Sequence, residues 1–250
     1  MTSEYRGSQK HLLDLLDRKT ERLTDLCEIV SPSPVAIKEG DVFRPSGRED
    51  PKESYLPQFC KEFCEGKFDF SPIVDWWVPS QWRPPTWDLI STCTVNGKYG
   101  ILLVEAKAHK DEFDCRGKIL EPTASIESQQ NHQQIVECLN EANVALNDIC
   151  DGEFNLSVDT HYQLANRVAH LWKLATCGIP VVLLYLGFVG DTEIRKTYFQ
   201  SDKDWQKAMG DYMQGLVPPS FLNQQHDTEG GGTMLMLSRS REILEKSSPR

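Results

Sequence analysis

Residues 87–108 read WDLISTCTVNGKYGILLVEAKA, and this stretch decides the fold. Two apolar, β-rich runs lie on either side of Asn96-Gly97, and Asn-Gly is the dipeptide that most strongly favours a two-residue type I′ turn. The stretch therefore predicts an antiparallel hairpin made of strands 87–95 and 98–108.

Three ionisable side chains meet at the open end of this hairpin. The turn sets a register in which Asp88 faces Glu105, with Cβ atoms roughly 4.5–5.5 Å apart. Lys107 projects from the same face, because side chains two residues apart in a strand point the same way. Two opposed carboxylates destabilise a hairpin unless a cation compensates, and their oxygens favour Mg²⁺ or Mn²⁺. A surface-facing Asp/Glu/Lys network at the rim of a sheet is the alternative that the residue types leave open.

The order of Asp88 and then Glu105-x-Lys107 resembles the motif of the PD-(D/E)XK nuclease superfamily, here of the prokaryotic type. In that family the aspartate starts one strand and E-x-K ends the next. Trp87 stands where the family has a proline, with Pro84-Pro85 slightly upstream, and this position varies in such proteins. The resemblance implies a restriction-endonuclease-like α/β fold, a three-layer α/β/α sandwich with a central mixed β-sheet and helical elaborations.

The resemblance also implies a role for each site residue. Asp88 and Glu105 would bind Mg²⁺ or Mn²⁺ together with the backbone carbonyl of Ala106, and Lys107 would position or help deprotonate the attacking water. Superfamily members often carry a glutamine on a later helix, and Gln163 resembles it. A metal of this kind polarises a phosphoryl oxygen and lowers the pKa of bound water, while a nearby ammonium stabilises developing negative charge.

The helix predicted over residues 160–177 carries this glutamine on a polar stripe. Gln163, Asn166, Arg167 and His170 recur at helical spacing, opposite an apolar stripe that would pack on the sheet. Packed in this way, the helix presents Gln163 and Arg167 toward the carboxylate end of the hairpin. A solvated polar face is the alternative for the stripe, and we expect His170 to be structural rather than a metal ligand.

Hydrophobic periodicity and turn residues divide the rest of the chain into elements of a single domain, 1–250. A nuclease-like core is expected over about residues 68–190, with an N-terminal helix and loop over 1–67 and a C-terminal elaboration over 191–250. The expected elements are a helix over 8–30, a loop over 34–57, a short helix over 56–65, a strand over 68–78, helices over 127–150 and 160–177, a strand over 181–188 and a helix over 205–216.

Composition limits the classes of function. The chain has 27 Lys and Arg against 37 Asp and Glu, a formal net charge of −10, which argues against a broad basic surface that coats nucleic acid. Any nucleic-acid contact must therefore be local. No apolar run approaches the roughly 20 residues of a membrane span, and the N-terminus lacks a signal peptide's apolar segment, so we expect no membrane partner and a cytoplasmic location. The eight cysteines, without CxxC pairs, are interpreted as reduced thiols.

These observations predict a divalent-metal-dependent nuclease, an endonuclease that hydrolyses phosphodiester bonds, with DNA as the expected substrate because the fold is mostly used on DNA. A catalytically silent nuclease-fold module for binding or assembly is the alternative. The net charge of −10 favours the silent module, and the intact Asp–Glu–Lys set opposes it. The chain has no P-loop, G-x-S-x-G or HExxH motif of other enzyme classes. A homodimer, common where both strands are cut, is left open.

Overall fold

The hairpin forms as the Asn-Gly turn predicts. Strands β5 (Leu89–Val95) and β6 (Lys98–Lys107) pair antiparallel in the expected register. Asn96 and Gly97 have positive φ angles of 51° and 76°, which a type I′ turn requires at both positions. The computed structural model describes residues 5–77, 85–150, 152–193 and 197–243, so Pro84 of the predicted motif lies outside it.

The antiparallel ladder ends one residue short of the predicted carboxylate pair. Its last pair is Leu89 with Val104, and Asp88 lies between β5 and the two-residue strand β4 (Thr86–Trp87). The backbone leaves the ladder here because β4 pairs with β3 (Ser54–Tyr55) instead. The predicted cross-strand pairing of Asp88 therefore does not form, and its side chain reaches the neighbouring strand in another way.

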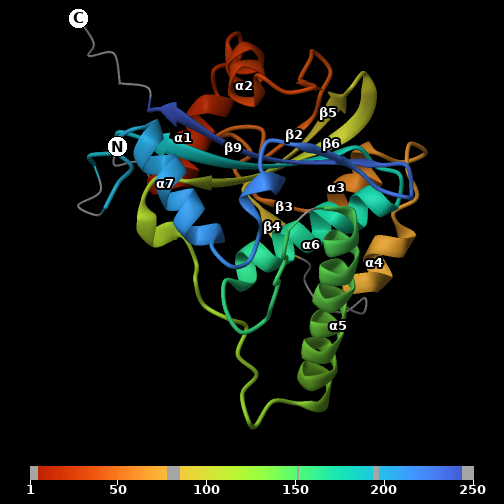
Figure 1. The fold of residues 1–250 in the computed structure, drawn as a ribbon. Coiled ribbons are helices and arrows are strands. Elements are labelled where there is room, and N and C mark those ends of the chain that lie inside the picture. The colour runs from red at the N-terminus through yellow and green to blue at the C-terminus, as the bar shows by residue number, and fades with distance from the viewer. Residues whose placement is uncertain (1–4, 78–84, 151, 194–196, 244–250) are drawn as a thin grey trace, which may run out of the picture.

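The hairpin belongs to a mixed sheet (Figure 1). The other strands of this sheet are β1 (Val35–Ala36), β2 (Phe43–Arg44), β7 (Val181–Val189), β8 (Gln225–Asp227) and β9 (Thr233–Glu242). Their order is β1-β5-β6-β7-β9-β8, and β2 also pairs with β5. The β6–β7 and β7–β9 pairs are parallel and the other pairs are antiparallel.

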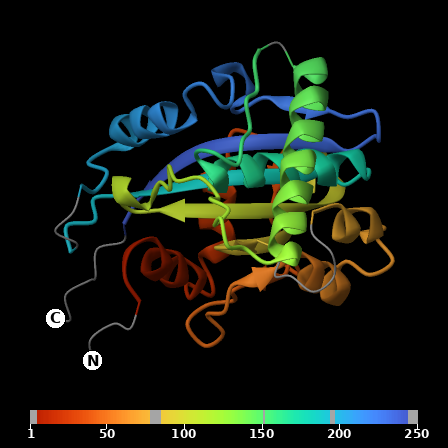
Figure 2. The same cartoon turned by 90° about the horizontal axis from the view of Figure 1, so that it is seen from below.

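Helices cover both faces of the sheet and give three layers (Figures 1 and 2). They are α1 (Gly7–Leu16), α2 (Arg22–Val30), α3 (Leu56–Phe63), α4 (Ser71–Trp77), α5 (Ile126–Ile149), α6 (Tyr162–Thr176) and α7 (Asp202–Met213). Helices α1 and α2 pack on one face, and α3 to α7 contribute to the core on the other. The predicted α/β class with a central mixed sheet is confirmed, as are the short helix now called α3, the helices α5, α6 and α7, and the strand β7.

Alternation along β6 decides which residues face which helices. Val104 belongs to the core shared with α1 and α2, whereas Leu103 belongs to the core shared with α5 and α6. Since side chains two residues apart share a face, Glu105 and Lys107 project to the side of Leu103. The two charged residues therefore face α6, the helix that carries the predicted glutamine.

Two predicted elements near the N-terminus are wrong. The helix expected over 8–30 is two helices, α1 and α2, separated by a polar segment whose Arg18 bonds the Asp25 carboxylate. The strand expected over 68–78 does not form: residues 68–70 belong to no helix or strand, Ser71–Trp77 form helix α4, and Val78 lies outside the described residues.

The residues of α4 contain the signal for a helix. Pro72 is the second helical residue, where the missing N–H is not needed, and the Asp69 carboxylate accepts the Ser71 N–H at 3.0 Å. Ile73, Trp76 and Trp77 are all buried, at the i, i+3, i+4 spacing of one helix face. The aromatic and β-branched composition had favoured a strand, but the spacing of the buried residues determined a helix.

Strand β9 extends the sheet beyond the expected core of residues 68–190. No strand was predicted after residue 190, yet β9 pairs in parallel with the whole of β7. Strands β1 and β2 add residues from the segment expected to be a loop over 34–57. None of the helices in the described part of the chain has the length and apolar character that a bilayer crossing demands.

Candidate active site at the end of strand β6

Asp88 takes the place of a strand partner at the end of the hairpin. Beyond Val104, β6 has no further pairing with β5, although it continues along β7 on its other side. The Asp88 carboxylate accepts the main-chain N–H of Ala106 through Oδ2 at 2.7 Å. The loop before β5 thus brings this aspartate next to Glu105-Ala106-Lys107, although not by the expected cross-strand pair.

Glu105 is a buried anion held by two cations. Its side chain is 2% exposed, Oε1 accepts from Lys107 Nζ at 2.7 Å, and Oε2 accepts from Arg167 Nε at 2.8 Å. Burial raises the pKa of this carboxyl, but the charges and hydrogen bonds of Arg167 and Lys107 outweigh it, so the pKa lies below its usual value. Glu105 is therefore ionised in the free protein.

Arg167 anchors helix α6 to the hairpin. Its Nη2 donates to the Thr86 carbonyl at 2.7 Å and its Nη1 donates to Asn166 Oδ1 at 2.9 Å. The guanidinium also lies 4.3 Å above the Trp87 ring, a favourable cation–π distance. The sequence analysis placed Arg167 on the polar stripe that faces the carboxylates, but it did not include it among the catalytic candidates. Its position one helical turn after Gln163 is the sequence feature that could have identified it as a site residue.

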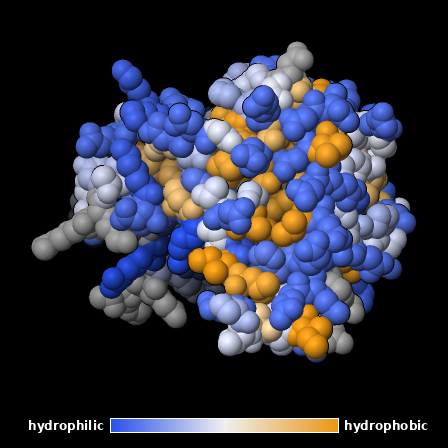
Figure 3. All heavy atoms as spheres, turned by 60° about the horizontal axis from the view of Figure 1, so that its bottom comes forward, coloured by the Kyte–Doolittle hydropathy of each residue, from blue (hydrophilic) through white to orange (hydrophobic). Residues whose placement is uncertain are grey.

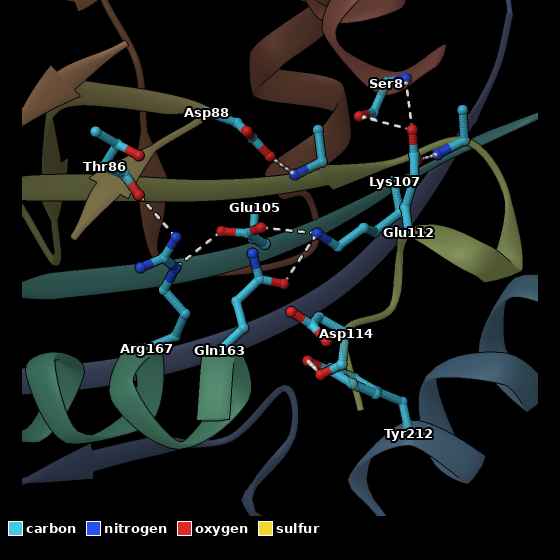
Figure 4. Close-up of polar contacts among 12 residues, drawn as sticks. Ser8, Thr86, Asp88, Glu105, Lys107, Glu112, Asp114, Gln163, Arg167 and Tyr212 are labelled. Atoms are coloured by element: carbon cyan, nitrogen blue, oxygen red, sulfur yellow. Dashed lines mark hydrogen bonds and ion pairs between the residues drawn. The ribbon is translucent and has the colours of Figure 1, made fainter. Parts of the chain in front are cut away.

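Gln163 completes a chain of contacts across the site (Figure 4). Its Oε1 accepts from Lys107 Nζ at 3.2 Å, so that Lys107 bridges Glu105 of β6 and the first turn of α6. The four side chains predicted from sequence, Asp88, Glu105, Lys107 and Gln163, therefore come together at one place. They come from three separate segments of the chain.

The pKa of the second carboxylate, Asp88, is shifted in the opposite direction to that of Glu105. Burial raises the pKa of Asp88 to about 7, and the neighbouring charge of Glu105 adds to this rise, whereas Lys107 and the Ala106 N–H oppose it. The rise in the Asp88 pKa reflects mainly the loss of water around its carboxylate, so the ionised form is poorly stabilised in the free protein. A cation beside it would lower the pKa and favour the ionised form.

The donor chemistry of these groups fits a hard divalent ion. No three His, Cys, Asp or Glu side chains gather into a metal-binding group in the described ranges 5–77, 85–150, 152–193 and 197–243. The expected ligand set contains only two such side chains, because the third donor is the carbonyl of Ala106. Carboxylate oxygens have further lone pairs beyond those used by Lys107, Arg167 and the Ala106 N–H. Oxygen-only sets of this kind favour Mg²⁺ or Mn²⁺.

Comparison with known proteins gives this chain no relative. No family model matches it. Searches of the curated proteins and of the solved structures also return no match. The resemblance to a nuclease family is therefore carried by the order of the motif alone.

His170 lies outside this set of contacts, as expected for a structural residue. It is buried, its Nδ1 bonds the Asn166 carbonyl at 2.7 Å, and its ring packs against Trp77 with centroids 4.5 Å apart. Burial lowers its pKa from 6.5 to about 4. The ring is therefore neutral near pH 7 and packs like an aromatic core residue.

Sequence reasoning missed two neighbours of the site. Asp114, from the segment after β6, lies beside Lys107 and Gln163, although both of its carboxylate oxygens accept from Arg116 (Figure 4). Tyr185 of β7 pairs with Glu105 in the parallel register, and its buried hydroxyl has no hydrogen-bond partner among the described residues. No local pattern marks either residue, because both reach the site only through the packing of the sheet and α6.

A cleft opens beside Gln163 and Arg167. It has a volume of about 750 Å³, and its walls come from Pro85-Thr86, the 114–124 segment, the first turns of α5 and the first turns of α6. Gln163 and Arg167 belong both to this wall and to the network around Glu105. A substrate in the cleft would therefore lie directly beside the ion network.

Proposed function

We propose that this protein is a divalent-metal-dependent nuclease of the PD-(D/E)XK superfamily that hydrolyses phosphodiester bonds of DNA. The observation that carries the proposal is the chain of contacts Asp88–Ala106, Glu105–Lys107 and Lys107–Gln163. Four residues chosen from the sequence for one reaction lie together, and one of them, Gln163, also lines a cleft. Chance would not be expected to place them so.

Each side chain has a role that suits its chemistry. Asp88, Glu105 and the carbonyl of Ala106 would hold Mg²⁺ or Mn²⁺, which when bound activates water and polarises the phosphoryl group. Lys107 holds its ammonium beside Glu105, where it can orient the attacking water and stabilise charge that develops on the phosphate. Gln163 also accepts a hydrogen bond from that ammonium. Arg167 keeps the buried Glu105 ionised.

The surroundings agree with a DNA-directed enzyme that acts through a local site. The net charge of −10 leaves no excess of basic residues, so DNA would be engaged at the cleft rather than over a broad surface. We infer a cytoplasmic location because all eight cysteines are free thiols. A homodimer that cuts both strands is compatible with this proposal.

The test is cleavage of plasmid and single-stranded DNA in Mg²⁺, Mn²⁺ or EDTA. Glu105→Gln should abolish metal-dependent cutting, because the amide keeps the shape of the carboxylate but removes its charge. Glu137→Gln, an exposed residue of α5, is the matched control and should cut like the wild type. Cutting by Glu105→Gln at the wild-type rate would reject this site.

A catalytically silent binding module is the second candidate, and one observation favours it. Both oxygens of Glu105 are already paired with cations, so the charges of Asp88, Glu105, Lys107 and Arg167 balance without a metal. Calorimetric titration with Mn²⁺ separates the two candidates. Heat of binding that disappears in Glu105→Gln supports the nuclease, and the absence of any heat in the wild type supports the silent module.

A further inference from the structure

One cation on the wall of the cleft takes no part in the network around Glu105. Lys118 lines the cleft and is exposed, and no carboxylate of the described ranges forms an ion pair with its ammonium. Arg167 lines the same cleft but holds Glu105, and the Asp114 carboxylate is taken by Arg116. In a chain with 37 acidic and 27 basic residues, an ammonium without an acidic partner at this place has its charge available for an anionic ligand.

The backbone fixes the position of Lys118. Its N–H donates to the Val158 carbonyl at 2.7 Å, and its carbonyl accepts from Nε2 of His132 at 3.0 Å. Gly117 permits this close approach of two segments, because a Cβ at that position would lie 2.2 Å from the carbonyl oxygen of Asp159. The exposed side chain of Lys118 therefore starts from an anchored point of the cleft wall.

The side chain of Lys118 lies over an aromatic ring of α6. Its Nζ is 5.3 Å from the centroid of the partly buried Tyr162 ring, a distance at which the ring attracts a cation. Tyr162 directly precedes Gln163, which accepts a hydrogen bond from Lys107. The unpaired ammonium is thus held beside the turn of α6 that contacts the proposed catalytic lysine.

A phosphate of a nucleic-acid strand fits the chemistry of this wall. Hydroxyl and amide side chains line the cleft together with Lys118, among them Thr123, Ser128 and Gln163. Ammonium, hydroxyl and amide groups are the side-chain donors that bind phosphate and sugar oxygens in protein–DNA complexes. Because the cleft shares Gln163 and Arg167 with the network, a strand whose scissile phosphate lies at the carboxylates can place a neighbouring phosphate in the cleft.

The rim of the cleft also carries exposed apolar side chains. Ile119 is 83% exposed and Leu120 is 37% exposed, and both line the cleft. Figure 3 shows hydrophobic side chains gathered among hydrophilic ones on the face that carries α5. Exposed apolar groups also suit a protein partner such as a second copy of this chain. The adjacent unpaired ammonium favours a phosphate instead, because lysine is depleted where protein surfaces meet.

We propose that Lys118 binds a backbone phosphate of the DNA strand, next to the scissile phosphate. The proposal rests on the proposed nuclease function and adds a residue that holds the substrate strand in the cleft. A contact of this kind carries no sequence information. It releases counterions from the DNA, so it contributes a measurable salt dependence to binding.

The experiment measures binding in EDTA, where cleavage cannot occur. Fluorescein-labelled single-stranded and duplex oligonucleotides are titrated by anisotropy over a series of KCl concentrations. Lys118→Met keeps the aliphatic stem and removes the charge, so it should weaken binding by about fivefold at low salt. The slope of log K against log [KCl] should become less steep, by about 0.7 for the single strand and about 0.9 for the duplex. Lys118→Arg should keep the wild-type slope. Lys19→Met, an exposed residue between α1 and α2 on the opposite face of the sheet, is the control and should bind like the wild type.

Three results would overturn the proposal. One is a wild-type salt dependence in Lys118→Met, and another is a wild type that binds neither oligonucleotide. The third is a wild-type dimer in sedimentation that Ile119→Ser dissociates, because a second copy would then cover the rim of the cleft. Metal-dependent cutting with an unchanged salt dependence in Lys118→Met rejects the phosphate contact and keeps the nuclease. A reduced salt dependence in Lys118→Met without any cutting by the wild type rejects the nuclease and keeps the contact.

Discussion

Glu105 on the α6 face of the sheet and Asp25 on the opposite face are both buried carboxylates between two cations. Asp25 of α2 accepts from Arg18 at 2.6 Å and from Arg241 of β9 at 2.5 Å, so it ties a helix to the sheet. The two carboxylate side chains are 2% and 8% exposed. A buried acid flanked by basic side chains therefore does not by itself mark an active site.

The surroundings of Glu105 make the difference. Asp88 adds a second carboxylate whose pKa burial and the charge of Glu105 raise to about 7, so the pair would gain from a metal ion. A cleft of about 750 Å³ shares Gln163 and Arg167 with the network. A second carboxylate with a raised pKa and a cleft next to the network distinguish the candidate catalytic network from a structural ion pair.

The largest expected effect is on cleavage, which should depend on Asp88 but not on Asp25. Asp88→Asn should reduce metal-dependent cleavage on the order of 10⁴-fold, because one charged ligand is lost. Its stability at pH 8 should be unchanged or higher, since a raised pKa means that ionisation of Asp88 destabilises the folded state. Asp25→Asn should cut normally but lose about 2 kcal/mol of unfolding free energy, because two partly buried arginines lose their anion. Cleavage assays measure the activity of the two variants, and urea denaturation measures their unfolding free energy. Normal cleavage by Asp88→Asn together with lost cleavage in Asp25→Asn would contradict the assignment of the two carboxylates.

Arg167 should matter for folding as much as for cleavage. Arg167→Ala leaves Glu105 with one cation and removes the bonds to Thr86 and Asn166, so we expect a loss of about 3–5 kcal/mol in the free energy of unfolding. Arg167→Lys should recover only part of it, because an ammonium cannot reproduce the planar fork. Denaturant unfolding of the variants measures the loss. Stability equal to the wild type for Arg167→Ala would show that the contacts make no net contribution.

His170, on the same helix but outside the network, should affect stability through pH. Its pKa falls from 6.5 to about 4 on folding, because burial disfavours the charged ring. The unfolded chain therefore binds the extra proton first, and stability should fall as pH drops from 6.5 to 4, by about 3 kcal/mol in total. His170→Gln should remove this part of the slope. An unchanged pH profile of the unfolding free energy in the variant would contradict a buried neutral ring.

The smallest effect is expected for Gln163→Ala. This change removes one 3.2 Å contact to Lys107 while Glu105 still holds the ammonium, so cleavage should fall by about tenfold. Steady-state cleavage should show the loss in kcat rather than in KM. Gln134→Ala, a partly buried glutamine of α5 outside the ion network, serves as the control. A wild-type rate for Gln163→Ala would leave the glutamine as part of the cleft wall only.

Local signals predicted more of this protein than long-range ones. The Asn96-Gly97 turn, the period of α5 and α6 and the apolar run of β7 all lie within short windows, and each element forms where expected. Helix α4 was missed because composition was weighed above spacing. Strand β9 was missed because its four apolar residues, Met234–Leu237, identify a strand only when β7 is there to pair with it.

The sequence by itself determined the hairpin and the order of Asp88, Glu105 and Lys107 along it, because turn chemistry and strand alternation act between near neighbours. Only the tertiary structure decided which side chains these residues contact. Arg167 reaches Glu105 across 62 residues of chain, and the cleft forms only when α5 and α6 pack beside the 114–124 segment. Such contacts depend on how whole layers pack, and no short stretch of sequence encodes that.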